Sequence, residues 1–350
     1  AEADLGLEAL PRARYIAVTG TNGKTTTTAL IGHLLGMAGR RVEAVGNIGT
    51  PLSEIALRDE PPEWLAVELS SFQLHDMAEL RPAVGVLTNL APDHLDRYDS
   101  LADYYGDKAR LFRHSGSSPV WVTNADDAES EAMTAGLAGR RLRFSLRTQA
   151  DGWFDRAGGR LMLGHEALMA RAELGLLGDH NVANALAAAL AVQATGVDLA
   201  TIAEGLATFR ALEHRMEPIR EVGGVLWIND SKATNIASTE VAVAALARPF
   251  VLLLGGRHKG EPYTRLGALL TGRCRAVIAY GEAQPIVLAD LAGAGVPLVP
   301  AGSFDDVMAR AGGLARPGDA VLLSPACSSY DMFKNYEERG RRFRRIVEAM

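Results

Sequence analysis

Short apolar runs alternate with longer amphipathic or alanine-rich stretches along the chain. In the first half, the runs that predict strands are residues 15–19, 42–45, 64–69, 84–90 and 120–123. Stretches with helical periodicity, such as 26–37 and 101–112, lie between them. Strands that alternate with helices are typical of an α/β fold with a mostly parallel sheet.

Residues 141–176 interrupt this alternation. The segments 141–145, 152–154 and 159–164 predict short hairpins added to the sheet, and residues 181–195 predict an alanine-rich buried helix.

The alternation restarts near residues 209–215. Further strands are predicted at 225–228, 250–254, 276–280, 297–299 and 320–323, with helices at 236–247, 303–315 and 331–348. We therefore expect two α/β domains, residues 1–211 and 212–350, which suits a chain of 350 residues.

Composition narrows the class of protein. A net charge of −6 argues against nucleic acid as the main partner, and no apolar run approaches the ~18 residues that cross a membrane. The acidic start does not resemble a signal peptide, and residue 1 is alanine, so we expect an N-terminal part to be missing. Cys274 and Cys327 offer neither metal spacing nor a disulfide framework. A reducing cytoplasm is the expected compartment.

Lysine is rare in this chain, with five lysines beside 31 arginines. All five lie in short motifs rich in glycine, asparagine or aromatic residues: Lys24, Lys108, Lys232, Lys259 and Lys334. Drift from lysine to arginine in a GC-rich gene could also leave five lysines by chance. Because a lysine amine is a compact charge that can also react, we instead expect these positions to mark an active site.

The strongest single motif is Gly-Thr-Asn-Gly-Lys-Thr-Thr, residues 20–26, which follows a strand and opens a helix. The loop N–H groups and the helix N-terminus suit phosphate oxygens, Lys24 adds a charge, and the Thr25 hydroxyl can ligate Mg²⁺. The spacing departs from the full Walker form, which has its first glycine two residues earlier, where this chain has Val18. A structural turn without a ligand is the less favoured interpretation.

Two further side chains are predicted near this loop. Glu68 ends the strand 64–69, and His94 lies in Asn-Leu-Ala-Pro-Asp-His-Leu-Asp (89–96). Open α/β sheets place ligand groups at or just beyond strand carboxyl ends. A carboxylate and an imidazole could ligate Mg²⁺ there, although the metal prefers oxygen and a lone histidine is more often a loop residue.

Seven motifs in order along the chain together resemble the Mur ligases. They are residues 20–25, Glu-Leu-Ser-Ser-Phe-Gln (68–73), the segment 89–96, Gly-Asp-His-Asn-Val-Ala-Asn-Ala (178–185), Glu-His-Arg (213–215), Asn-Asp-Ser-Lys-Ala-Thr-Asn (229–235) and Leu-Ser-Pro-Ala-Cys-Ser-Ser (323–329). The segments 70–73, 229–235 and 333–340 are most similar to the family members that add D-glutamate.

The resemblance implies a fold and a reaction. The fold is a central P-loop-type ATPase domain, with a mostly parallel sheet and added β-hairpins, followed by a Rossmann-like open α/β domain. The reaction is ATP-dependent amide formation between UDP-N-acetylmuramoyl-L-alanine and D-glutamate, through an acyl phosphate, in peptidoglycan precursor synthesis. Charge neutralisation and positioning dominate such transfers. The implied protein is a monomer with small-molecule substrates and no membrane partner.

The resemblance also implies residue roles in the first domain. ATP would be held by residues 20–26, namely Gly20, Thr21, Asn22, Gly23, Lys24, Thr25 and Thr26, together with Asn184, Arg215 and Asp230. Two Mg²⁺ ions would be served by Thr25, Glu68, His94 and Lys108, with Lys24 also catalytic. Asn47 and Ser71 would contact the muramoyl substrate.

Lys108 has a special implied role. An ammonium repels a metal ion, and the family carbamylates this lysine with CO₂ to give a carboxylate-like group. From its own neighbourhood Lys108 would be a surface lysine on the helix 101–112.

In the second domain, the resemblance implies that Lys232, Thr234, Lys259, Ser329 and Tyr336 bind the incoming amino acid. A dicarboxylate needs several cationic or hydroxyl partners. Tyr336 replaces the phenylalanine expected of the family. Lys334 stays outside the predicted site as an exposed residue of the last helix, and Cys327 is expected to be a packed thiol.

The family normally carries a further small domain that binds UDP before the glycine loop. Only about twenty residues precede the loop in this sequence, so we expect that domain to be absent here and the affinity for the UDP-substrate to suffer. Two other functions stay open: a folylpolyglutamate synthase that adds L-glutamate, and a non-catalytic nucleotide-binding module. The motifs at 229–235 and 324–327 argue against the first, and Lys259 with Ser329 argue against the second.

Overall fold

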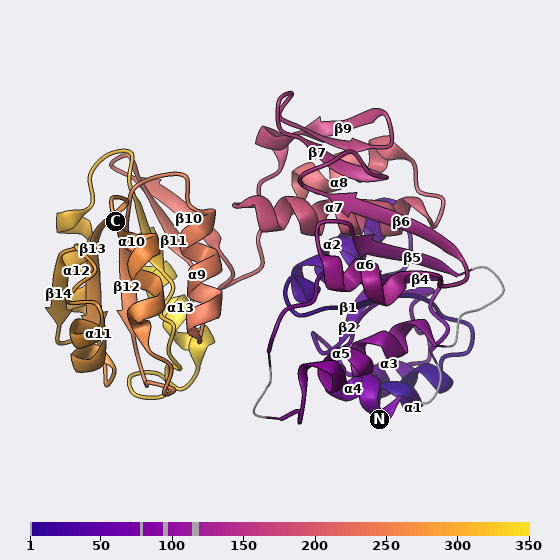
Figure 1. The fold of residues 1–350 in the computed structure, drawn as a ribbon, viewed down its shortest axis with the longest axis horizontal. Coiled ribbons are helices and arrows are strands. Elements are labelled where there is room, and N and C mark those ends of the chain that lie inside the picture. Colours follow the sequence, from indigo (N-terminus) through magenta and orange to yellow (C-terminus); the bar gives the residue numbers. More distant parts are fainter. Residues whose placement is uncertain (1, 78–79, 94–96, 114–118) are drawn as a thin grey trace. The chain divides into compact units, whose positions relative to one another are not determined.

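A computed structural model describes residues 2–77, 80–93, 97–113 and 119–350. The chain divides into two compact units (Figure 1). Unit 1 comprises the residues up to 175 together with 179–210, and unit 2 comprises 176–178 together with 211–350.

Unit 1 is built on a nine-stranded sheet in the order β2-β3-β1-β4-β5-β6-β7-β8-β9. Its strands are β1 (Arg14–Thr19), β2 (Val42–Gly46), β3 (Trp64–Glu68), β4 (Val84–Leu87), β5 (Val120–Asn124), β6 (Arg140–Ser145), β7 (Gly152–Asp155), β8 (Arg160–Leu163) and β9 (Glu166–Ala170). Pairing is parallel from β2 to β7 and antiparallel in β7-β8-β9. The predicted hairpins therefore lie at one edge of the sheet, although β6 belongs to its parallel part.

Helices cover both faces of this sheet. They are α1 (Glu2–Glu8), α2 (Lys24–Met37), α3 (Leu52–Ala56), α4 (Ser71–Asp76), α5 (Leu101–Ala109), α6 (Ala128–Thr134), α7 (Asp179–Gln193) and α8 (Leu199–Thr208), with short 3-10 turns at Arg110–Phe112 and Arg171–Glu173. The helices α2, α7 and α8 pack together, and α4 packs on α5. The alanine-rich α7 is buried along most of its length, as predicted.

Two helix starts in unit 1 have clear local causes. Ser70 and Gln73 form a capping box at the start of α4, and the Ser100 side chain accepts from the N–H of Asp103 at the start of α5. Such caps satisfy the free N–H groups of a first turn. They fix the two helices that carry Ser71 and Lys108.

Unit 2 is an open six-stranded sheet in the order β10-β11-β15-β12-β13-β14. Its strands are β10 (Glu217–Val222), β11 (Val225–Asn229), β12 (Phe250–Gly255), β13 (Cys274–Tyr280), β14 (Leu298–Ala301) and β15 (Ala320–Leu323). Its helices are α9 (Ile236–Ala245), α10 (Gly267–Leu270), α11 (Gln284–Asp290), α12 (Phe304–Leu314) and α13 (Tyr336–Glu348), with a 3-10 turn at Tyr263–Leu266. All pairs are parallel except β10 with β11.

Two predicted boundaries were wrong, and one strand was not predicted. The strand expected at 84–90 ends at Leu87, because the next residues bend back to hold the glycine loop. The last helix starts at Tyr336 and not at 331, since the Asn335 side chain caps it by accepting from the N–H of Glu338. The antiparallel edge strand β10 was not predicted, because charged residues and a proline interrupt it and Ile219 and Val222 are its only strand-favouring apolar residues.

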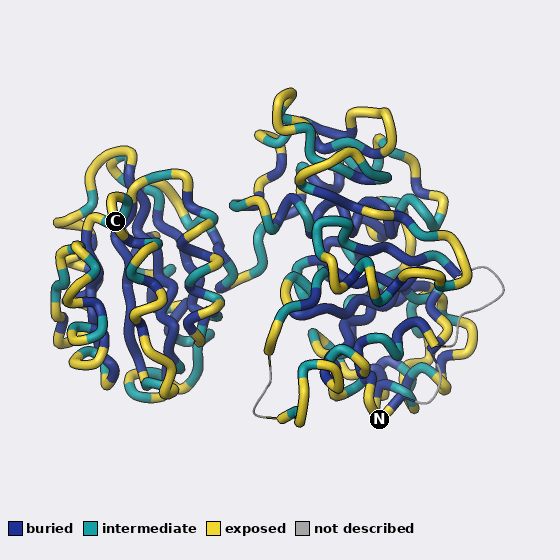
Figure 2. The backbone as a smooth tube through the Cα atoms, in the orientation of Figure 1, coloured by how far each residue is buried: buried dark blue, intermediate teal, exposed yellow. Residues whose placement is uncertain are grey.

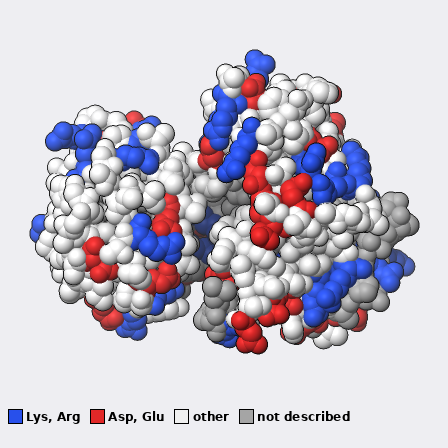
Figure 3. All heavy atoms as spheres, in the orientation of Figure 1, with Lys and Arg blue, Asp and Glu red and all other residues white. Residues whose placement is uncertain are grey.

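The strands form the buried centre of each unit, and the exposed backbone lies in loops and on outer helix faces (Figure 2). Two apolar layers lie in unit 2, one on each side of the sheet. On the face drawn in Figure 3, acidic and basic side chains are interspersed. Within the described ranges, no helix combines the length and the apolar character needed to span a bilayer.

Candidate active site

The glycine loop is the turn between β1 and α2. The backbone φ angles of Gly20 and Gly23 are 143° and 83°. A Cβ atom on Gly20 would also collide with the Thr88 side chain. Only glycine combines that backbone with that close approach. The strand β1 lies between β3 and β4, where the strand order reverses, and open α/β sheets bind ligands at such a point.

The segment after β4 holds this loop in place. The backbone carbonyl of Asn89 accepts from the N–H of Thr21 at 2.9 Å. The Asn89 amide makes two 2.9 Å hydrogen bonds with the backbone of Asn22, and the Thr88 hydroxyl donates to the Asn22 carbonyl at 2.6 Å. The loop conformation is therefore fixed by its own neighbours, as a preorganised anion site requires.

The Lys24 amine lies over the loop. Its Nζ donates to the carbonyls of Gly20 and Thr21 at 3.1 and 2.9 Å. Thr25 and Thr26 follow in the first turn of α2, where the positive end of the helix favours anions.

Asn184 on α7 lies beside the same loop. A Cβ atom on Gly23 would collide with the Asn184 side chain, whose Oδ1 accepts from the Thr27 hydroxyl at 3.3 Å. Its Nδ2 donates to Asn181 Oδ1 at 3.1 Å. Unit 1 thus brings together residues 20–26 and Asn184, which are distant in sequence.

Lys108 is buried at the back of the loop. Its Nζ donates to the Gly20 carbonyl at 2.7 Å and lies 4.6 Å from the centroid of the Tyr104 ring. Burial, with a smaller contribution from the charge of Lys24, lowers the Lys108 pKa to about 7. Lys108 is only 1% exposed, so the prediction of a surface lysine, which its neighbouring residues suggested, is wrong.

Glu68 ends β3 beside β1. Its Oε1 accepts from Asn47 Nδ2 at 3.0 Å, whereas Oε2 is buried and has no hydrogen-bond partner among the described residues. Ser71 is buried at the start of α4. His94 lies outside the described residues. Among the residues that the structure does describe, no three His, Cys, Asp or Glu side chains gather closely enough to hold a metal.

In unit 2, three loops leave the carboxyl ends of β11, β12 and β15. Lys259, after β12, donates from Nζ to the Thr234 hydroxyl, after β11, at 3.4 Å. The Lys232 amine lies 5.2 Å from the centroid of the Tyr336 ring. The Ser231 hydroxyl donates to the Tyr336 carbonyl at 2.8 Å. Four of the five residues predicted to bind the amino acid therefore lie in one linked cluster.

The fifth residue, Ser329, is tied to that cluster by a side chain that was not predicted. Arg339 on α13 is fully buried. Its guanidinium donates to the Ser231 carbonyl at 2.8 Å and to the Cys327 carbonyl at 3.2 Å. It thereby joins the loop of Lys232 to the loop of Ser329. Arg339 was quoted within the motif 333–340 without being given a role, and its charged neighbours Glu337 and Glu338 do not indicate burial.

Arg215 lies between the two strained residues His214 and Met216. Their φ angles are 66° and 42°, and residues with side chains adopt such values mainly where the surroundings impose them. The Asn229 amide contacts His214 Nδ1 at 2.9 Å. Strain of this kind often marks functional sites, and His214 was quoted in a motif without being given a role.

Asp230 lies next to this turn and is buried. Its carboxylate accepts from the N–H of Met216 at 3.0 Å and from the Ser324 hydroxyl at 2.8 Å. Burial raises the Asp230 pKa to about 7 despite these donors. The Cys327 thiol is likewise buried, its pKa is raised to about 11, and it is packed as predicted.

Both units match models of one class of enzyme. Residues 18–192 match the Mur ligase middle domain, and residues 214–327 match the Mur ligase, glutamate ligase domain. The chain belongs to the Mur ligase family.

Named relatives narrow the class. The chain is 42% identical to the UDP-N-acetylmuramoylalanine–D-glutamate ligase of Salinibacter ruber, over 97% of the chain and 76% of that protein. It is 41% identical to the ligase of the same name from Acidobacterium capsulatum, over 97% of the chain and 74% of the relative.

Solved structures of more distant enzymes share the fold. The UDP-N-acetylmuramate-alanine ligase of Thermotoga maritima gives a TM-score of 0.70 at 19% identity, covering 98% of this chain and 77% of the other. MurF from Acinetobacter baumannii gives 0.74 at 18% identity, covering 99% and 79%. At this identity the likeness concerns the fold alone.

Proposed function

We propose that this chain is an ATP-dependent ligase that joins D-glutamate to UDP-N-acetylmuramoyl-L-alanine and forms ADP and phosphate. The observation that carries the proposal is the placement of Lys108. It is a buried amine 2.7 Å from the Gly20 carbonyl, beside a preorganised phosphate loop. The relatives are named as ligases of UDP-N-acetylmuramoylalanine and D-glutamate, which supports this pair of substrates.

Phosphoryl transfer would rely on the loop of unit 1. Lys24 Nζ now contacts two carbonyls of the loop, and phosphate oxygens are stronger acceptors for the same ammonium. The loop N–H groups, with Thr25 and Thr26, would hold the ATP phosphates, and Asn184 would contact the nucleotide. Because such transfers pass negative charge between anions, neutralising that charge is the main catalytic task.

Mg²⁺ fits the residues of this region. The buried Oε2 of Glu68 is an oxygen ligand with no partner in the part of the chain that the structure describes, and burial without a partner is costly unless a cation or donor satisfies the charge. Thr25, Glu68, His94 and a modified Lys108 would hold two Mg²⁺ ions. Bound there, the metal would supply positive charge to ATP and to the acyl phosphate.

The lowered pKa of Lys108 supports its carbamylation. CO₂ reacts only with the neutral amine, in which the nitrogen lone pair attacks carbon, a C–N bond forms and one proton leaves. With a pKa of about 7, a large share of the amine is neutral at physiological pH. The carbamate nitrogen keeps one N–H, which can still donate to Gly20.

D-Glutamate would bind to the cluster in unit 2. Lys232 and Lys259 offer two ammonium groups, and Thr234, Ser329 and Tyr336 offer hydroxyls for a dicarboxylate. Tyr336 replaces the phenylalanine expected of the family, so its hydroxyl is an additional hydrogen-bonding group in this cluster. In unit 2, Arg215 and Asp230 would contact the phosphates and ribose of ATP.

The test is phosphate release from ATP and Mg²⁺ with UDP-N-acetylmuramoyl-L-alanine. D-Glutamate and L-glutamate are compared, and the Salinibacter ruber relative serves as positive control. We expect release that needs both the acceptor and D-glutamate. Release driven by L-glutamate with a folate acceptor would replace this proposal with the folylpolyglutamate synthase alternative. No release at saturating acceptor, with an active control, would reject ligase activity for this chain.

A further inference from the structure

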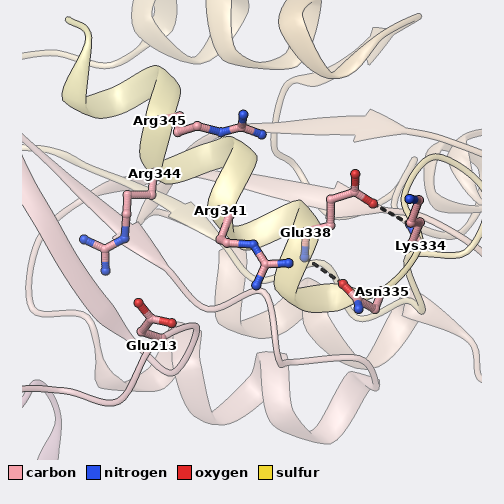
Figure 4. Close-up of a pocket in the computed structure, with 7 residues that line it drawn as sticks. All are labelled: Glu213, Lys334, Asn335, Glu338, Arg341, Arg344 and Arg345. Atoms are coloured by element: carbon pink, nitrogen blue, oxygen red, sulfur yellow. Dashed lines mark hydrogen bonds between the residues drawn. The ribbon is translucent and has the colours of Figure 1, made fainter.

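Helix α13 has two chemically different faces. Its buried face carries Arg339, which holds the loops of Ser231 and Cys327. Its outer face borders a cavity of about 540 Å³ in unit 2. The cavity is lined by Glu213, Lys334, Asn335, Glu338, Arg341, Arg344 and Arg345 (Figure 4).

The cations around this cavity are unevenly paired. Arg344 forms ion pairs with Glu217 and Glu348. Within the described ranges, no carboxylate lies within ion-pair distance of the side chains of Lys334, Arg341 or Arg345, all of which are exposed. Other arginines on the surface of unit 2 form ion pairs with carboxylates, for example Arg248 with Glu221 and Arg310 with Asp306.

The two carboxylates of the cavity do not neutralise this cluster. Glu338 accepts from the backbone N–H of Lys334 at 2.8 Å, so part of its charge serves the turn before the helix. In Figure 4, Arg344 extends from α13 on the side of Glu213, Arg345 and Glu338 extend on the other side, and Arg341 lies between them over the front of the helix. Four cationic side chains thus face two carboxylates around one hollow.

We propose that this cavity binds a diphosphate group, with Arg341, Arg345 and Lys334 as its ligands. A cavity lined by unpaired guanidinium and ammonium groups favours a multiply charged oxyanion. Arg341 and Arg345 are four residues apart on one helix, a rise of about 6 Å, which suits two linked phosphates better than one. Arginine also binds phosphate through two parallel N–H groups.

The cavity and the glycine loop are built from different residues of different units. The loop lies in unit 1 and the cavity in unit 2, and none of the cavity residues belongs to the groups proposed above to bind ATP or D-glutamate. The diphosphate could be free pyrophosphate or part of a nucleotide such as UDP. The proposal does not depend on the ligase reaction.

The test is calorimetric titration of the whole chain with inorganic pyrophosphate in metal-free buffer. The variant is the double substitution R341Q/R345Q. The matched control is R248Q/R310Q, which removes the same charge from paired arginines of the same unit. A Lys24→Ala variant removes the main cation of the glycine loop, and circular dichroism checks that each variant is folded.

We expect pyrophosphate binding to persist in Lys24→Ala and in R248Q/R310Q, and to weaken about tenfold or more in R341Q/R345Q, since charge-assisted hydrogen bonds are lost. A second titration with UDP shows whether a nucleotide can supply the same group. The proposal is overturned if Lys24→Ala abolishes all binding, or if the control weakens it as much as R341Q/R345Q. It is also overturned if the unsubstituted chain binds no pyrophosphate.

Discussion

The amine of Lys108 donates a 2.7 Å hydrogen bond to the carbonyl of Gly20, a residue 88 positions earlier in the chain. The bond joins α5 to the phosphate loop, and both groups lie in the buried part of unit 1. The charge that Lys108 brings to the loop depends on whether its amine is protonated, neutral or carbamylated. The first two predictions concern this charge.

Lys108→Arg should abolish ligase activity. A guanidinium stays charged and cannot react with CO₂, so the site gains a fixed cation where the proposed mechanism needs an anion. We expect kcat to fall at least about 100-fold, comparable to the loss of one charge-stabilising group in other enzymes. Phosphate release measures it. Lys334→Arg is the matched control, because Lys334 is exposed and lies outside the proposed catalytic groups; equal losses in both variants would contradict the role of Lys108.

Carbamylation of Lys108 should increase with pH through about 7. Burial lowers the pKa of this amine to about 7, so the reactive neutral form is the minor species below that value and the major species above it. Carbon-13 NMR with labelled bicarbonate would follow a carbamate signal that is missing in Lys108→Arg. A signal that appeared only near the ordinary lysine pKa of 10.5 would mean that the amine is not perturbed as described.

Local motifs could be predicted from the sequence, whereas the burial and the long-range contacts of their side chains could not. Residues 20–26 were recognisable because strand, glycine turn and helix are local features. The burial of Lys108 was not, since it depends on how α5 packs against a loop 88 residues away. Arg339 was missed for the same reason: its partners are backbone carbonyls of distant loops, and carbonyls leave no pattern in a sequence. The capped start of α13 shows that a single asparagine can shift a predicted boundary by five residues.

Asp230 should make unit 2 less stable as pH rises from about 4 to 7. Its pKa is raised from 3.8 to about 7, chiefly by burial. A carboxyl with a raised pKa binds its proton more tightly in the folded state, so its contribution to stability is complete below the unfolded pKa and is lost as pH rises through the folded pKa. The loss is up to about 4 kcal/mol.

Asp230→Asn provides the measurement. The amide keeps a similar shape but does not titrate, so the melting temperature should fall less between about pH 4 and 7 than in the unsubstituted chain. Asp306, a partly exposed carboxylate whose pKa is lowered by its hydrogen bond with Arg310, gives a control variant Asp306→Asn that should leave this pH dependence in place. Parallel pH curves for the chain and for Asp230→Asn would contradict the assignment.

Tyr263 should position the loop that carries Lys259. Its buried hydroxyl lies 2.8 Å from Cys327 Sγ and 3.1 Å from His258 Nδ1, so it links the loop after β12 to the loop after β15. Tyr263→Phe removes both contacts and leaves the ring. We expect a stability loss of about 1 kcal/mol, typical of one neutral hydrogen bond.

In kinetics, Tyr263→Phe should raise KM for D-glutamate several-fold and leave KM for ATP and kcat nearly unchanged, because only the loop of Lys259 loses a fixed point. Cys327→Ser is the comparison variant for the hydrogen bond to the tyrosine hydroxyl. It keeps a hydrogen-bonding atom opposite the tyrosine hydroxyl, so its KM should stay closer to that of the unsubstituted chain. If Tyr263→Phe changed KM for ATP as much as KM for D-glutamate, the hydroxyl would be supporting unit 2 in general and not the amino-acid loop.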